Sequence, residues 1–264
     1  MSTYLITGAN GGLGAATARE LAARGHRVVL AVRDPARATP PPGDTEVRRL
    51  DLADLTSVRE FAAGWSGGLD VLINNAGVMA VPYAKTADGF ETHMAVNHFG
   101  PFLLTDLLLP HVTGRVVTVS SGLARTRRLR LDDLNWERRR YSALGAYSQS
   151  KLANLLFTQE LQRRLTASGS AVRAVAAHPG VARTGLDRHF GRPLALLLKA
   201  LYPVIAQKKP EYGALPILFA ATEDVPGNAY VGPGGRNGER PRLERRTDHA
   251  GARELWEISA RLTA

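Results

Sequence analysis

Short apolar runs rich in β-branched residues alternate with helical periodicity along the whole chain. Strands joined through helices pair in parallel, and their crossover helices cover both faces of the sheet, so this order predicts a doubly wound α/β fold. The seven expected strands are Tyr4 to Thr7, Val28 to Val32, Val47 to Leu50, Val71 to Asn74, Val116 to Val119, Val172 to Ala177 and Ala229 to Val231. The expected helices are Gly12 to Arg24, Leu55 to Trp65, Asp88 to Leu109, Ala143 to Thr166 and Pro210 to Thr222.

The size and composition suit one domain over residues 1–264. A chain of 264 residues with 44% hydrophobic side chains can bury one substantial core. It has no cysteine, which excludes disulfides and cysteine nucleophiles, and its seven histidines lack ligand spacing, so no metal site is expected. The sequence shows no secretory leader and no apolar run of about 20 residues. We therefore expect a cytoplasmic protein without a transmembrane segment.

The formal net charge is +10, which raises the question of a nucleic-acid partner. The basic residues are spread over most of the chain, apart from two arginine clusters within 125–130 and 138–140. No aromatic series for base stacking accompanies them, so nucleic-acid binding is not expected. The clusters form either a solvated surface or, as a weaker alternative, a site for an anionic group on a substrate.

A glycine-rich turn, Thr7-Gly8-Ala9-Asn10-Gly11-Gly12-Leu13-Gly14, lies between the first strand and the first helix. Glycines there let the backbone turn sharply and bring helix N-terminal N–H groups close to a pyrophosphate. The position after a strand and before a helix is the context that such a motif requires. We therefore expect a dinucleotide to bind here, in contact with Gly8, Asn10, Gly11, Gly12, Leu13 and Gly14.

The end of the second strand bears on which dinucleotide binds. A carboxylate at this place usually accepts hydrogen bonds from the ribose of NAD, whereas an arginine accommodates the 2′-phosphate of NADP. Val32 offers no carboxylate, and Arg33 can form a charge-assisted bond to phosphate. The sequence therefore favours NADP (NADPH) over NAD. In the alternative interpretation, Asp34 binds the ribose.

Tyr147 and Lys151 are spaced four residues apart on an expected helix, so they share one face. A free tyrosine titrates near pH ~10, so proton transfer near neutrality requires a shift of roughly 3 units, or about 4 kcal/mol. A lysine ammonium favours the phenolate, but it is too weak to supply that shift alone. An oxidised nicotinamide would add a second positive charge.

Together, these motifs resemble the short-chain dehydrogenase/reductase family, over nearly the whole chain and in the family's order. The further motifs that carry the resemblance are Asn74-Asn75-Ala76-Gly77, Asn97, Ser120-Ser121 and Pro179-Gly180. The segment 97–104 and the length of chain between Ser121 and Tyr147 are more similar to retinol dehydrogenases and WW-domain oxidoreductases. The resemblance implies a Rossmann-type fold and hydride transfer with a nicotinamide cofactor.

The resemblance also implies roles for individual residues. Tyr147 would be the general acid in carbonyl reduction, and Lys151 would lower its pKa and bind the nicotinamide ribose. Ser121 would hydrogen-bond the substrate oxygen, with Ser120 as its rival. Asn97 would hold a water that links Lys151 to solvent; alternatively, its amide satisfies backbone groups at a helix irregularity.

Further cofactor contacts are implied in the same way. Asn75, Ala76 and Gly77 would pack against the adenosine side, Asp51 with Leu52 would meet the adenine, and Pro179, Gly180, Val181 and Thr184 would contact the nicotinamide end. A role for Asp51 as a helix cap is a competing interpretation.

The function expected from these residues is an NADP(H)-dependent alcohol dehydrogenase or carbonyl reductase for a small molecule. The alternative is an NADP(H)-sensing binding protein without turnover, which would have no need for Asn97, Ser121, Tyr147 and Lys151 together. By analogy with the family, we expect a homo-oligomer, a dimer or tetramer, formed through the helix that carries Tyr147 and its neighbour.

The apolar segment at about 185–210 follows a strand's carboxyl end. It is expected to form a substrate lid over an apolar pocket. A packed surface helix and a peripheral membrane contact are the alternatives.

Overall fold

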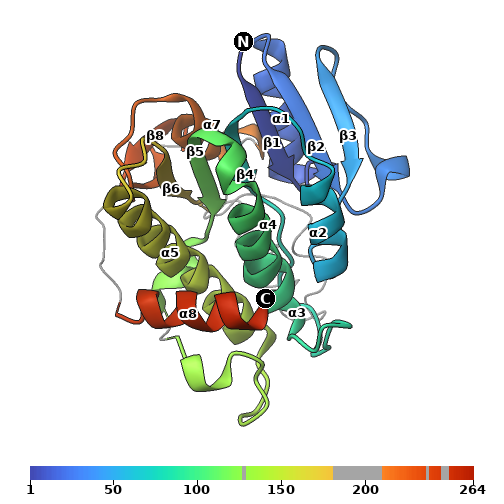
Figure 1. Ribbon diagram of the computed structural model, residues 1–264. Helices are drawn as coiled ribbons and strands as arrows, with labels where there is room; N and C mark the ends of the chain where they lie inside the picture. The colour runs from blue at the N-terminus through green and yellow to red at the C-terminus, as the bar shows by residue number, and fades with distance from the viewer. Residues whose placement is uncertain (127–128, 181–209, 236–237, 245–249) are drawn as a thin grey trace.

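The computed structural model describes residues 1–126, 129–180, 210–235, 238–244 and 250–264. A single twisted sheet runs through the molecule, with helices on both of its faces (Figure 1). Residues 181–209 lie outside the described part, so the expected lid, Val181 and Thr184 cannot be placed.

The sheet contains all seven predicted strands and one more. The strands are β1 (Thr3–Thr7), β2 (Arg27–Val32), β3 (Thr45–Arg49), β4 (Leu69–Asn74), β5 (Val112–Val119), β6 (Arg173–Ala177), β7 (Tyr230–Gly234) and β8 (Arg240–Leu243). Their order is β3-β2-β1-β4-β5-β6-β7-β8, and β8 alone is antiparallel to its neighbour. The prediction of seven strands was therefore one short. β8 reads Arg-Pro-Arg-Leu, a short run with proline that suits only an edge.

The helices follow the predicted order, and the one expected over 88–109 contains a π-helical turn. They are α1 (Gly12–Ala23), α2 (Leu55–Ala63), α3 (Thr92–Met94), α4 (Gly100–Leu108), α5 (Ala143–Ala167), α7 (Leu215–Thr222) and α8 (Ala252–Leu262). The helix expected over 88–109 starts later, at Thr92, and contains a π-helical turn, Ala95–Phe99, between α3 and α4. A π turn adds a residue to the helical ring, a change that apolar periodicity does not reveal.

Side chains of the central strands alternate between two apolar cores. In β1, Leu5 contributes to the core beneath α2, α4 and α5, whereas Ile6 contributes to the core beneath α1 and α7. The same alternation separates Val116 from Val117 in β5. Because both faces are covered, the central strands are apolar almost throughout, as parallel sheets require.

Helix α8, which the sequence analysis did not predict, packs across α5 (Figure 1). The Trp256 ring is parallel to that of Phe157, at 5.7 Å between centroids, and meets Phe102 of α4 edge to face at 4.9 Å. His98 Nε2 lies 2.8 Å from Ser259 Oγ, which ties α8 to the π turn. Part of the α5 surface expected to mediate oligomerisation is thus covered within the chain.

In the part of the chain that the structure describes, no helix combines the length and the apolar character needed to cross a membrane.

Candidate active site

The four predicted catalytic residues come together at the carboxyl ends of the central strands, where open α/β sheets bind ligands. Ser121 follows β5, Tyr147 and Lys151 lie in the first half of α5, and Asn97 lies in the π turn. Ser142 caps the N-terminus of helix α5, because its side chain accepts the Gly145 N–H at 3.2 Å. This cap fixes where the helix starts and therefore the face that carries Tyr147.

Tyr147 is almost fully buried, with 6% of its surface exposed. Burial raises the pKa of its phenol, and a hydrogen bond with Ser121 opposes that rise. The structure also separates the two rival serines. Ser120 donates to the carbonyl of Lys151 at 2.7 Å, whereas Ser121 is the one that bonds the phenol. Ser121 is therefore the serine placed to share a substrate oxygen with Tyr147.

Lys151 lies buried beneath the phenol. Its Nζ is 5.9 Å from the centroid of the Tyr147 ring and donates to the carbonyl of Val119 at 2.9 Å. Burial lowers the pKa of this ammonium to about 8. The cation that should favour the phenolate is thus held close to it. The lowered pKa also means that the ammonium starts to lose its proton at a lower pH than an exposed lysine would.

Asn97 uses its whole amide to hold the loop after β4. Its Oδ1 accepts the Val78 N–H at 2.8 Å, and its Nδ2 donates to the Val78 carbonyl at 3.0 Å and to Ser150 Oγ at 2.8 Å. Of the two interpretations drawn from the sequence, this geometry matches an amide that satisfies backbone groups at a helix irregularity. Asn97 thereby fixes the loop against α5 at Ser150, the residue directly before Lys151.

The glycine-rich turn forms a cradle at the N-terminus of α1. Gly8 and Gly12 have φ values of +67° and +54°, which other residues rarely adopt. No side chain caps α1, and an added Cβ at Gly11 or Gly12 would meet nothing within 4 Å. Uncapped N–H groups facing open space fit a pyrophosphate. Asn10 and Leu13 lie in the same turn.

The loop after β4 closes on this cradle. Oγ1 of Thr7 accepts the N–H groups of both Asn75 and Ala76 at 3.0 Å, and Asn75 Nδ2 donates to the Thr7 carbonyl at 2.8 Å. A Cβ at Gly14 would lie 2.6 Å from Asn75 Nδ2, so the α1 backbone sits directly against this amide. The predicted cofactor residues of these two loops are therefore neighbours.

The remaining predicted cofactor residues lie in two other loops, one after β6 and one after β3. Gly180, at φ +70°, donates its N–H to His178 Nδ1 at 3.2 Å, and Pro179 precedes it at the end of β6. Asp51 Oδ1 accepts the Ala53 N–H at 3.0 Å, and Leu52 is buried in the core. The helix cap considered for Asp51 falls instead to Asp54, which accepts two N–H groups of α2.

At the end of β2, the structure distinguishes the two charged residues. Asp34 Oδ1 accepts the Ala36 N–H at 3.1 Å and caps the 3₁₀ turn Pro35–Arg37. Arg33 is exposed, and no described residue pairs with its guanidinium. The carboxylate is thus engaged locally while the arginine is available.

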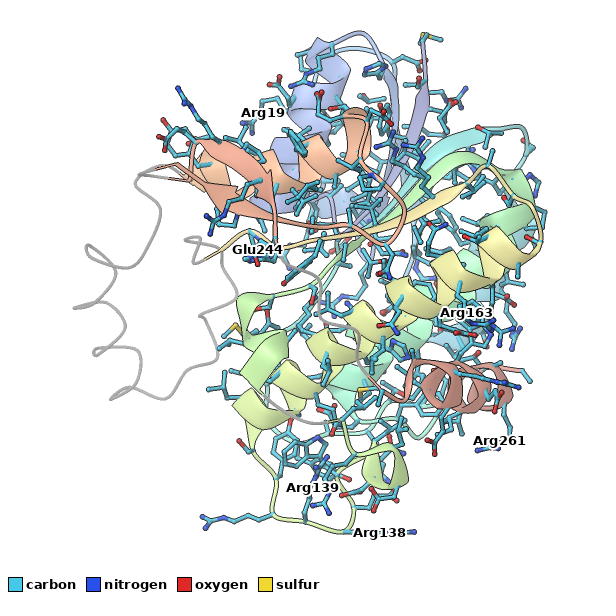
Figure 2. The ribbon with its side chains drawn as sticks, turned by 90° about the vertical axis from the view of Figure 1, so that its left-hand side faces the viewer. Arg19, Arg138, Arg139, Arg163, Glu244 and Arg261 are labelled. Atoms are coloured by element: carbon cyan, nitrogen blue, oxygen red, sulfur yellow. The ribbon has the colours of Figure 1, made fainter. Side chains whose placement is uncertain are left out.

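The residues that contact Ser121 and Tyr147 and hold them in place were not identified from the sequence. Tyr230 of β7 donates its hydroxyl to the Ser121 carbonyl at 3.1 Å, and its ring lies 4.9 Å from that of His178. His178 in turn lies 2.9 Å from Glu244, just beyond β8 (Figure 2). A second buried group, Glu91 with His93, lies near Tyr147. Sequence spacing gave no signal for these contacts, because they join distant segments.

The labelled arginines lie at different ends of the molecule (Figure 2). Arg19 is on α1, Arg163 and Arg261 are on the neighbouring helices α5 and α8, and Arg138 lies in the segment before α5. Arg139 is not free: its guanidinium lies 3.7 Å from the centroid of the Trp136 ring and its Nε lies 3.2 Å from Asp133 Oδ2. Arg127 and Arg128 fall outside the described residues.

Comparison with known proteins agrees with this arrangement. Residues 2–194 match the family model for short chain dehydrogenases. The chain is 44% identical to human retinol dehydrogenase 13 and 43% identical to human retinol dehydrogenase 14, across 98% and 97% of its own length and 84% of each relative.

Two solved structures have the same fold. One is the crystal structure of an uncharacterized protein from Mycobacterium paratuberculosis, with a TM-score of 0.85 and 51% identity over 100% of this chain and 93% of that one. The other is a dehydrogenase/reductase from Sinorhizobium meliloti, with a TM-score of 0.66 and 25% identity over 88% and 92%. The chain therefore belongs to the short-chain dehydrogenase/reductase family of oxidoreductases and is similar to retinol dehydrogenases.

Proposed function

We propose that this oxidoreductase transfers a hydride between NADP(H) and the alcohol or carbonyl group of an apolar small molecule. The observation that carries the proposal is the group of Ser121 with the buried Tyr147 and Lys151, which joins a proton donor, a hydroxyl and a cation at one place. A cofactor-sensing protein without turnover would not need this combination.

The protein's own part in the reaction is to orient the substrate and move a proton. When bound, the nicotinamide supplies or accepts the hydride. Ser121 Oγ and Tyr147 Oη hold the carbonyl oxygen, and Tyr147 gives its proton to that oxygen as negative charge develops. Lys151 stabilises the phenolate that remains. In alcohol oxidation, the phenolate removes the proton from the hydroxyl.

The state of Arg33 and Asp34 supports NADP(H) rather than NAD(H). Asp34 is occupied with the cap of the 3₁₀ turn, and Arg33 is exposed at the strand end with no described ion-pair partner. An available guanidinium can bind a 2′-phosphate through charge-assisted hydrogen bonds. We expect Arg33→Ala to raise the KM for NADPH and leave that for NADH unchanged. A wild-type preference for NADH would contradict this assignment.

The substrate class rests on the names of the relatives and on the sequence. Retinol dehydrogenases 13 and 14 are named for an apolar alcohol, and the segment at about 185–210 is rich in leucine. We propose an apolar carbonyl compound or alcohol as substrate. The test is a screen of NADPH oxidation with aldehydes, ketones and quinones, including retinaldehyde.

The Tyr147→Phe variant tests the mechanism. We expect it to bind NADPH as the wild type does and to lose most turnover, because only the phenol oxygen is removed. Retained turnover would overturn the role of Tyr147, and a wild type that binds NADPH but reduces none of the screened compounds would favour the sensing alternative. Cytoplasmic location and oligomeric assembly stay predictions.

A further inference from the structure

A polar cluster of the buried Glu91 and His93 and the half-buried Tyr141 lies next to Tyr147 and has no part in the proton transfer described above. The side chains of Glu91 and His93 have no exposed surface, and Nδ1 of His93 is 2.7 Å from Oε1 of Glu91. The same carboxylate oxygen accepts from Tyr141 Oη at 3.0 Å, and Oε2 accepts the Met94 N–H at 3.0 Å. Both oxygens of Glu91 are therefore anchored.

The charge state of Glu91 fixes the orientation of the imidazole. Burial acts to raise the pKa of Glu91, but the hydrogen bond and charge of His93 outweigh it and lower this pKa. An ionised carboxylate only accepts hydrogen bonds, so Nδ1 of His93 carries the hydrogen of the shared bond. The imidazole cannot turn about its side-chain bonds without breaking that bond.

The oriented imidazole lies against the ring of Tyr147. The two ring centroids are 6.3 Å apart, with an angle of 68° between the planes, which is an edge-to-face contact. Nε2 of His93 is buried and has no hydrogen-bond partner among the described residues. His93 therefore reaches Tyr147 through its ring and not through a hydrogen bond.

We infer that His93, held by Glu91, is a positioning residue that keeps the Tyr147 ring in the orientation in which its hydroxyl meets Ser121. This inference rests on the proposed function for its effect on turnover. The phenol must be correctly placed for proton transfer, and small misplacements of reacting groups are costly. Loss of the ring contact should therefore reduce kcat without weakening cofactor binding.

Two variants separate the ring contact from the bond to Glu91. His93→Asn keeps an N–H donor near the place of Nδ1 but removes the ring, whereas His93→Phe keeps a ring edge and loses the donor. His98→Gln is the matched control, because His98 is also a buried histidine of the same helical region but pairs with Ser259. Unfolding midpoints and NADPH dissociation constants are measured for all of them.

We expect His93→Asn to lower kcat by ~10-fold or more at unchanged NADPH affinity. His93→Phe should keep kcat within about threefold of the wild type, and His98→Gln should match the wild type. Equal kcat for His93→Asn and the wild type would overturn the inference. The inference would also be overturned if His93→Asn and His93→Phe lost kcat equally and the loss followed the decrease in their unfolding midpoints.

A second measurement decides the inference even if no substrate is found. Tyrosines labelled with ¹³C at Cζ are titrated by NMR, and the Tyr147→Phe variant identifies the signal of Tyr147. Because the hydrogen bond to Ser121 opposes the rise of the Tyr147 pKa, its loss in His93→Asn should move the titration of Tyr147 to higher pH than in the wild type. His93→Phe and His98→Gln should not shift it. An unchanged titration in His93→Asn would refute positioning, whatever the outcome of the substrate screen.

Discussion

Gly77 lies where any side chain would press on Lys151. A Cβ added at Gly77 would be 3.2 Å from Nζ of Lys151 and 3.2 Å from Oδ1 of Asn97. Neither neighbour can easily give way, because Nζ is bonded to the Val119 carbonyl and the Asn97 amide is bonded to Val78. This glycine therefore sets how closely the loop after β4 approaches the catalytic lysine.

We expect Gly77→Ala to lower kcat/KM by ~10-fold, because the methyl group displaces Lys151 by a few tenths of an ångström. Steady-state kinetics with NADPH measure this. Gly67→Ala offers a control for general damage to the fold, since a Cβ there would meet nothing within 4 Å, although its φ of +83° adds local strain. Wild-type kinetics in the Gly77 variant would show that the lysine can move freely.

Alanine variants of the two adjacent serines should have different effects, one on catalysis and the other on stability. Ser121→Ala removes the hydroxyl that bonds Tyr147, and we expect kcat to fall on the order of 100-fold. Ser120→Ala removes a buried hydrogen bond to the Lys151 carbonyl, and we expect a loss of about 1 kcal/mol in the free energy of unfolding with little change in kcat. Urea unfolding and kinetics on both variants check this; a reversed pattern would assign the substrate contact to Ser120.

Burial of Lys151 should make the folded state more stable at alkaline pH. Its pKa is about 8 in the folded chain and ordinarily 10.5, so the cost of burying the charge is complete below pH 8. As the pH rises from 8 to 10.5, the folded state has released the proton that the unfolded state retains, and stability rises.

Lys151→Met removes this cost. We expect the cofactor-free variant to exceed the wild type in free energy of unfolding at pH 7, by up to about 3 kcal/mol, and the difference to shrink by pH 10. Urea unfolding at both values measures it. A difference that is independent of pH would contradict the lowered pKa of Lys151.

His98 should make the folded state less stable at acidic pH. Burial lowers its pKa from 6.5 to about 3, with the hydrogen bond of Asn154 opposing the shift. Between these values the unfolded chain binds a proton that the folded chain does not, so stability falls as the pH drops below 6.5. His98→Gln should lose about 2 to 3 kcal/mol less than the wild type between pH 7 and pH 4.5. Parallel pH profiles for the two proteins would disprove the contribution.

Periodicity and motif order predicted most of the architecture but missed β8 and α8. Alternation of strands and helices predicted the doubly wound sheet, because a right-handed crossover through a helix leaves few other arrangements. The glycine turn and the four-residue spacing of Tyr147 and Lys151 could be interpreted from the sequence, since both depend on local backbone geometry.

Only the tertiary structure decided contacts between segments that are distant in the chain. It assigned Ser121 rather than Ser120 to the phenol, because the Ser120 hydroxyl is already bonded to the Lys151 carbonyl. It placed His93 of α3 against Tyr147, and it placed Asn97 against Val78 in a π turn that no periodicity indicated. The spacing of residues in the sequence determines which of them share a helix face. The packing of helices and strands determines which residues of other elements that face contacts.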